Sequence, residues 1–120
     1  MSQKTHPAAL TLTLTLLLLL ASCAEGDTGP SGDRLYLQNG CGSCHGATGA
    51  GGSLGPALKD MSRFWDRNSM SAFFEDPKAT LRSDERLSKL SKTFSAGMPA
   101  FQYLTDDQAG RIADFVLSLK

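Results

Sequence analysis

The sequence predicts an all-α domain of short helices and long loops. No segment alternates convincingly between apolar and polar residues, as a half-buried strand would. The clearest periodicity is helical and lies near the C-terminus. Glycine and proline interrupt regular structure, so residues 46–57 are expected to form an irregular loop, because they contain Gly46, Gly49, Gly51, Gly52, Gly55 and Pro56. A chain of 120 residues has room for one small domain at most.

Two helices are expected in the first part of this domain. A short helix carries Leu35, Tyr36 and Leu37 and leads into Cys41. A second helix begins at Asn68 or Ser69, either of which can cap it, and places Met70, Phe73 and Phe74 on one face. Pro77 ends or interrupts this helix, because proline lacks the backbone N–H that a helix interior needs.

Two more helices are expected in the second part. One runs from about Ser83 towards Ser91, and residues 95–101 then return to loop. The last helix is the clearest, because Thr105 and Gln108 form a capping box in front of it. Its apolar residues follow at helical spacing and are Ala109, Ile112, Ala113, Phe115, Val116 and Leu119.

The N-terminal 22 residues are predicted to be a signal peptide and not part of the domain. They contain a weakly positive start followed by an uncharged apolar run that is short for a membrane span. Residues 20–23 read LASC, which resembles the lipobox of bacterial lipoproteins. This resemblance implies that Cys23 is lipidated, that residues 23–31 form a flexible tether, and that the domain occupies residues 32–120. An ordinary secretory signal with an incidental cysteine is the alternative, and both imply an exported protein.

Removal of residues 1–22 changes the inventory of charged and metal-binding residues. Lys4 is lost, so 11 basic residues face 12 acidic ones and the mature chain is nearly neutral. No basic stripe favours binding of nucleic acid. His6 is lost as well, which leaves His45 as the only histidine.

The segment CGSCH, residues 41–45, places two cysteines and this histidine within five positions. A disulfide between Cys41 and Cys44 would close only a tiny loop and stabilise little, and a redox-active pair is usually found in a βαβ setting. Structural zinc needs four ligands, and the mature chain offers no second pair. Cys-x-x-Cys-His is the attachment pattern of c-type haem, in which both thiols bond to one porphyrin edge and the histidine binds iron. The sequence therefore predicts one covalently bound haem c.

Residues 32–120 resemble class I monohaem cytochromes c. The N-terminal stretch GDRLYLQNGCGSCHGATGAGGSLGPAL is similar to the first helix, haem motif and following loop of that family. The stretch GMPAFQYLTDDQAGRIADFVLSL is similar to the sixth-ligand loop and last helix, whereas residues 60–95 match only in kind. The resemblance implies a small cytochrome c fold wrapped around the haem. It also implies a close crossing of the first and last helices, with Gly32 and Tyr36 facing Phe115.

The resemblance also suggests how the haem is held. The carbonyl group of Pro56 would accept the ring N–H of His45 and fix its orientation. Met98 lies between Gly97 and Pro99 on a loop and matches the Met-Pro pattern of the sixth ligand, so it is expected to bind iron opposite His45. Met61 and Met70 are the remaining candidates, although Met70 fits a core position. Five apolar residues are expected to line the haem crevice: Leu54, Leu58, Phe64, Phe94 and Phe101. Trp65 suits either a hydrogen bond to a haem propionate or a place in the core.

The predicted function is single-electron transfer by a lipid-anchored cytochrome on the periplasmic side of a bacterial membrane. His/Met ligation raises the reduction potential and leaves no open position for a substrate. Redox partners would be a quinol-oxidising complex, a terminal oxidase or a periplasmic dehydrogenase. A fixed haem subunit of an oxidoreductase complex is the main alternative. A peroxidase or gas sensor fits less well, because no distal catalytic pair can be assigned.

Overall fold

The computed structural model describes residues 27–120, and these are helical and irregular with no strand among them. The predicted all-α class is therefore confirmed. The predicted signal peptide and Cys23 lie outside the described residues. The helices are α2 (Gly32–Gln38), α3 (Cys41–His45), the 3₁₀ turn η2 (Met61–Arg63), α4 (Arg67–Glu75), α5 (Pro77–Ser83), α6 (Glu85–Ser91) and α7 (Asp106–Ser118).

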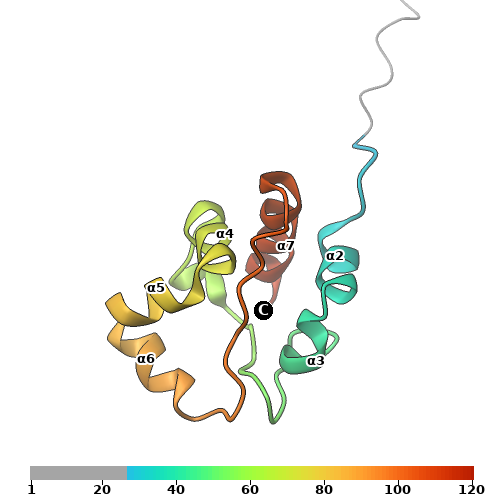
Figure 1. Ribbon diagram of the computed structural model, residues 1–120. Coiled ribbons are helices and arrows are strands. Elements are labelled where there is room, and N and C mark those ends of the chain that lie inside the picture. Colours follow the sequence, from blue (N-terminus) through green and yellow to red (C-terminus); the bar gives the residue numbers. More distant parts are fainter. Residues whose placement is uncertain (1–26) are drawn as a thin grey trace, which may run out of the picture.

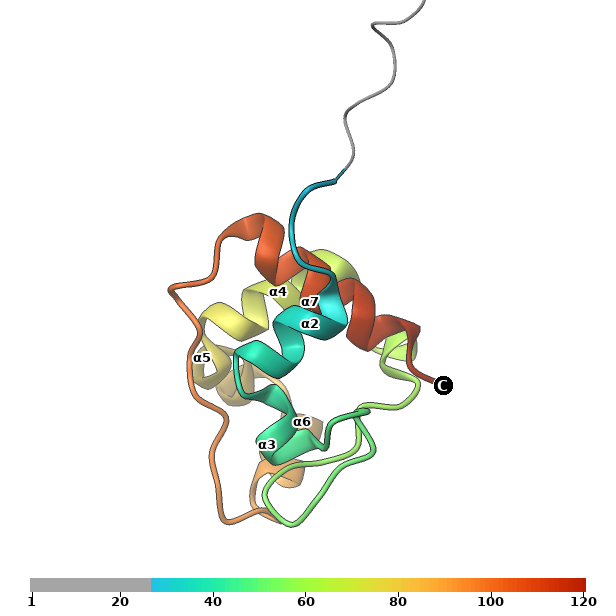
Figure 2. The same ribbon diagram turned by 90° about the vertical axis from the view of Figure 1, so that its right-hand side faces the viewer.

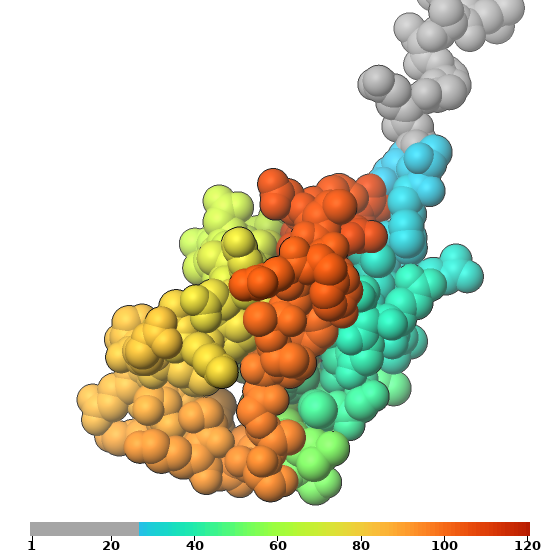
Figure 3. All heavy atoms as spheres, in the orientation of Figure 1, coloured from blue at the N-terminus to red at the C-terminus, as the bar shows by residue number. Residues whose placement is uncertain are grey.

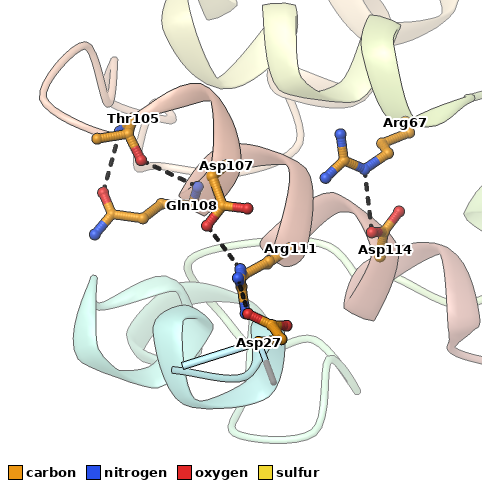
Figure 4. Close-up of polar contacts among 7 residues, drawn as sticks. All are labelled: Asp27, Arg67, Thr105, Asp107, Gln108, Arg111 and Asp114. Carbon is orange, nitrogen blue, oxygen red and sulfur yellow. Dashed lines mark hydrogen bonds and ion pairs between the residues drawn. The ribbon is translucent and has the colours of Figure 1, made fainter. Parts of the chain in front are cut away.

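Helix α7 is the centre of the arrangement and packs against both α2 and α4 (Figure 1). Its buried side chains come from Ala109, Ile112, Ala113 and Val116. The predicted capping box is present, because the Gln108 N–H donates to Thr105 Oγ1 at 3.2 Å and the Thr105 N–H donates to Gln108 Oε1 at 3.1 Å (Figure 4). The amphipathic pattern of residues 105–119 thus becomes the main core helix.

The crossing of α2 and α7 is a close backbone contact. A Cβ atom at Gly32 would overlap with the carbonyl oxygen of Arg111 and would lie 2.9 Å from the Cβ of Phe115. Tyr36 is buried one turn further along, and its ring meets that of Phe115 edge to face at 5.2 Å. Glycine at position 32 is therefore what allows the two helices to approach so closely.

Helix α4 covers another side of α7 and buries Met70 and Phe74. Its N-cap is Asp66, whose carboxylate accepts the Ser69 N–H at 2.8 Å, so the helix begins before the predicted caps Asn68 and Ser69. Asp66 is the better cap because its own N–H donates to Ser69 Oγ at 3.1 Å, which completes a capping box. Arg67 pairs with Asp114 of α7 at 3.1 Å on the outer surface (Figure 4).

Helices α5 and α6 follow α4 and extend away from the core (Figure 1). Pro77 separates α4 from the next helix as predicted, but it also begins α5, which the sequence did not indicate. Proline is favoured at the first helical position because its fixed φ suits a helix and its missing N–H has no partner there. Asp84 caps α6 by accepting the Leu87 N–H at 3.0 Å, and α6 ends at Ser91 as expected.

Residues 92–104 return from α6 to α7 across the front of the molecule in Figure 1. Phe101 holds this segment in place, because its N–H donates to the Phe74 carbonyl oxygen at 2.8 Å. At the other end of the described chain, Asp27 forms a bidentate ion pair with Arg111, which also bonds Asp107 at 2.7 Å (Figure 4). None of the helices within residues 27–120 has both the length and the apolar character needed to cross a membrane.

Candidate functional site

The segment CGSCH forms the one-turn helix α3, which lies below α2 in the view of Figure 2. Gly40 separates the two helices and adopts φ = 78°, a left-handed conformation that glycine tolerates without strain. This turn changes the direction of the chain directly before Cys41. As a result, the side chains of Cys41, Cys44 and His45 all border one cavity.

The two thiols are not joined in a disulfide. Cys41 is half-buried, and burial raises the pKa of its thiol above the usual value. A redox-active cysteine has the opposite property, because its thiolate is stabilised and its pKa is lowered. The environment of Cys41 therefore disfavours a dithiol redox centre of the kind considered for this motif.

His45 has a fixed ring orientation. Its Nδ1 donates to the Pro56 carbonyl oxygen at 2.8 Å, which is the hydrogen bond that the resemblance implies. Because Nδ1 carries the proton in this bond, Nε2 is left with a lone pair for a metal ion. His45 and Pro56 both line the cavity.

The glycine-rich loop after α3 is tied to the motif at several points. The Gly51 N–H donates to the His45 carbonyl oxygen at 2.7 Å, and Gly51 has φ = 85°. The Tyr36 hydroxyl donates to the Gly46 carbonyl oxygen at 2.7 Å. Burial raises the pKa of Tyr36 to about 12, so the hydroxyl stays protonated and remains a donor at neutral pH. These bonds turn an irregular loop into a defined support for His45.

Met98 is half-buried on the segment between α6 and α7 and borders the same cavity as Cys41, Cys44 and His45. All five residues predicted to hold the haem border this cavity, although Met98 follows His45 by 53 positions in the sequence: Cys41, Cys44, His45, Pro56 and Met98. Met61 and Met70 border the cavity as well. Met70 is only 4% exposed and belongs to the core between α4 and α7, whereas Met98 does not belong to a helix.

The cavity is mostly apolar and opens to solvent. About 270 Å³ of it is accessible to a water-sized group. Figure 3 shows a hollow between α6 and the segment that follows it. The apolar residues around it include Leu54, Leu58, Trp65, Phe73, Leu81, Leu87, Leu90, Phe94 and Phe101.

Four of the five predicted crevice residues line this cavity, and Phe64 does not. Its side chain is 60% exposed and lies under the Arg86 guanidinium, whose central carbon is 4.5 Å from the ring centre. Phe64 follows the η2 turn, and Trp65, the residue after Phe64, borders the cavity instead. Trp65 also packs on Phe73 with ring centres 5.2 Å apart. Sequence reasoning missed Arg86 at the cavity, and no motif marked it.

The family model for cytochrome c matches residues 31–120. The chain belongs to the cytochrome c family. Membership in this family implies covalently bound haem c, and Cys41 and Cys44 have the spacing for its attachment. The recognition of a cytochrome c from the sequence is thereby confirmed.

Two curated relatives of this cytochrome are CcoP subunits of cbb3-type cytochrome c oxidases. The protein from Azospirillum sp. (strain B510) is 35% identical over 92 residues, and the protein from Azospirillum brasilense is 32% identical over 92 residues. In both comparisons the match covers 74% of this chain but 30% of the relative, so this cytochrome corresponds to less than a third of each subunit. No solved structure matches significantly.

The residues of this cytochrome fit a haem c on chemical grounds. Two thiols on one short helix, an imidazole with a free Nε2 and a thioether border a single cavity. Apart from these groups the wall is largely hydrocarbon and aromatic, which suits a porphyrin. No buried side-chain N or O atom within residues 27–120 lacks a hydrogen-bond partner, so none in the wall needs one from a bound group.

Proposed function

We propose that this cytochrome passes single electrons between redox proteins through one haem c, held by Cys41 and Cys44 and ligated by His45 and Met98. The observation that carries the proposal is that these four side chains border one apolar cavity in a chain of the cytochrome c family. When bound, the haem supplies one-electron chemistry at its iron. The protein would supply the attachment at Cys41 and Cys44, the ligands His45 and Met98, and a largely apolar surrounding.

His45 acts as a rigid ligand. The hydrogen bond from Nδ1 to the Pro56 carbonyl oxygen selects the tautomer with a free Nε2 and increases the basicity of the ring. The bonds from Gly51 to the His45 carbonyl and from Tyr36 to the Gly46 carbonyl hold the neighbouring backbone. A ligand held in this way would keep its orientation, which would favour rapid electron transfer.

Met98 is the methionine best suited to be the second ligand. Met70 already fills a core position on α4, and removing it from there would leave a cavity. Met61 lies in the short η2 turn, which is tied to α7 because the Asp60 N–H donates to the Leu119 carbonyl oxygen at 3.0 Å. Met98 lies between Gly97 and Pro99 in irregular backbone and is only partly buried, so it fills no position inside a helix. A thioether ligand favours ferrous iron and a raised potential.

The partner and location form the second part of the proposal. A terminal oxidase is the favoured partner, because both curated relatives are subunits of cbb3-type oxidases. The chain would act either as a mobile carrier or as a fixed haem subunit of such a complex. The LASC segment supports export and a lipid anchor at Cys23 on the periplasmic side of the membrane. A peroxidase or gas sensor would require Met98 to leave the iron readily.

The test is replacement of Met98 in the mature holoprotein. Met98→Ala should abolish the weak far-red absorption band that ferric iron shows with a methionine ligand, lower the midpoint potential and allow carbon monoxide to bind the ferrous form. Met61→Leu and Met70→Leu are matched controls and should keep the band, because such swaps conserve volume. A band that survives in Met98→Ala would refute the ligand assignment. Wild-type protein that binds carbon monoxide readily would favour the sensor or peroxidase function.

A further inference from the structure

The haem cavity contains a single side chain with a permanent positive charge. Among the described residues that line it, Arg86 is the only arginine or lysine, and none is an aspartate or glutamate. Haem carries two propionate carboxylates at one edge of the ring. An ionised carboxylate placed against an apolar wall is unfavourable unless a cation or several donors accompany it. Arg86 is therefore the residue at which a carboxylate of the cofactor would find its counter-charge.

The guanidinium of Arg86 is held in place from two sides. Its central carbon lies 4.5 Å above the centre of the Phe64 ring, a distance typical of a cation–π contact. On another side, its Nη2 lies 3.5 Å from Oδ2 of Asp84, and Oδ1 of the same carboxylate caps α6 through the Leu87 N–H. The start of α6 thus fixes the position of the charge.

This arrangement leaves most of the hydrogen-bonding capacity of Arg86 unused. A guanidinium has five N–H donors, and the long contact with Asp84 engages one of them. The side chain is 43% exposed while the same residue borders the cavity, which places it at the rim and not in the interior. Trp65 directly follows Phe64 and also borders the cavity. An aromatic residue and the arginine therefore both line the cavity.

We propose that Arg86 is a positioning residue that binds a haem propionate at the rim of the cavity. The contact is a charge-assisted pair for which the planar guanidinium is suited, because it can present two parallel N–H donors to one carboxylate. The pair neutralises a negative charge near the iron and so raises the midpoint potential. The exposed ring of Phe64 has a role in this arrangement, because it packs against the guanidinium. This inference rests on the proposed function, because it requires haem attached at Cys41 and Cys44.

The experiment compares three variants of the haem-loaded protein by redox titration and resonance Raman spectroscopy. Arg86→Gln should lower the midpoint potential and shift the propionate bending mode. Arg86→Lys should recover most of the potential, because it keeps the charge. Lys89→Gln is the matched control: Lys89 lies on the same helix, is 73% exposed, pairs with Glu85 at 2.7 Å and does not border the cavity. This variant should leave both the potential and the Raman mode unchanged.

Two results would overturn the inference. One is an unchanged propionate mode and potential in Arg86→Gln. The other is an equal fall of potential in Arg86→Gln and Lys89→Gln, which would show a general charge effect of α6. If Arg86→Gln fails to mature, the propionate bending mode of Arg86→Lys is compared with that of the wild type. An unchanged mode would overturn the inference, because a lysine cannot form the bidentate contact. Absence of covalent haem from the wild-type protein would instead refute the proposed function, so the two failures are distinguishable.

Discussion

Replacement of Gly32 by alanine should destabilise the domain more than any other single added methyl group near the α2–α7 crossing. The new Cβ would lie 2.8 Å from the carbonyl carbon of Arg111 and 2.9 Å from the Cβ of Phe115, and it would overlap with the Arg111 carbonyl oxygen. Two of these three atoms belong to the backbone of α7, so no side-chain rotation can relieve the contact. The helices would have to separate.

The structure gives the size of the effect. Carbon atoms pack best at about 3.5–4.0 Å, so contacts of 2.8–2.9 Å require a separation of roughly 1 Å. A gap of that size removes a quarter to a half of the dispersion energy of the atoms facing it, including those of Tyr36 and Phe115. Overpacking costs about 1–3 kcal/mol, and a backbone clash belongs at the upper end. With a Tm change of about 4–8 °C per kcal/mol for a domain of this size, Gly32→Ala should lower Tm by roughly 12–24 °C.

The assay is thermal unfolding of the haem-loaded protein followed by far-ultraviolet circular dichroism. Gly110→Ala is the matched control, because Gly110 is buried on α7 and the nearest atoms to a Cβ there all belong to the guanidinium of Arg67. That side chain is 48% exposed and can swing aside, giving up an exposed ion pair worth about 0–1 kcal/mol. The gain in helix propensity is about 1 kcal/mol, so Tm should change little. Equal Tm values for wild type and Gly32→Ala, or equal losses in the two variants, would refute the reasoning.

Three further predictions concern attachment, anchoring and capping. Haem should remain with the protein through acid–acetone extraction, and Cys41→Ala or Cys44→Ala should yield a poorly folded chain; haem released into the solvent from wild type would contradict covalent attachment. Cys23→Ser should abolish metabolic labelling with palmitate and move the protein out of the membrane fraction, whereas unchanged labelling would exclude the lipobox. Thr105→Ala removes the side-chain acceptor of the Gln108 N–H, so unfolding should become easier by about 1 kcal/mol in a denaturant titration, and an unchanged midpoint would argue against the cap.

The parts of this protein that sequence reasoning predicted well are those in which local chemistry decides the structure. The capping box at Thr105 and the helical spacing after it identify α7 without knowledge of its neighbours. The spacing of CGSCH identifies the attachment segment in the same way. The α2–α7 crossing was expected from the resemblance, and Gly32 occupies the point of closest approach.

The parts that were missed depend on backbone states and contacts that no short pattern encodes. Pro77 was interpreted as a helix end, although it is also the first residue of α5. Phe64 and Trp65 are adjacent aromatic residues that follow the η2 turn, and no short pattern in the sequence indicates which of them borders the cavity. Arg86 could not be placed at the cavity because its position depends on α6 and on Phe64 together.

The distribution of buried residues explains why the position of Arg86 was harder to predict than that of the core residues. Nearly all of the fully buried apolar side chains belong to α2, α4 and α7, which form a core that resembles that of any small helical domain. In contrast, α3, α6 and residues 92–104 surround the cavity and have few buried partners of their own, Leu87 being the exception. Their apolar side chains face a space suited to a porphyrin, so their packing is specified by a group that the amino-acid sequence does not contain. Patterns that depend on protein–protein packing therefore predict α7 well, whereas the position of Arg86 on α6 becomes intelligible only when the cofactor is treated as part of the core.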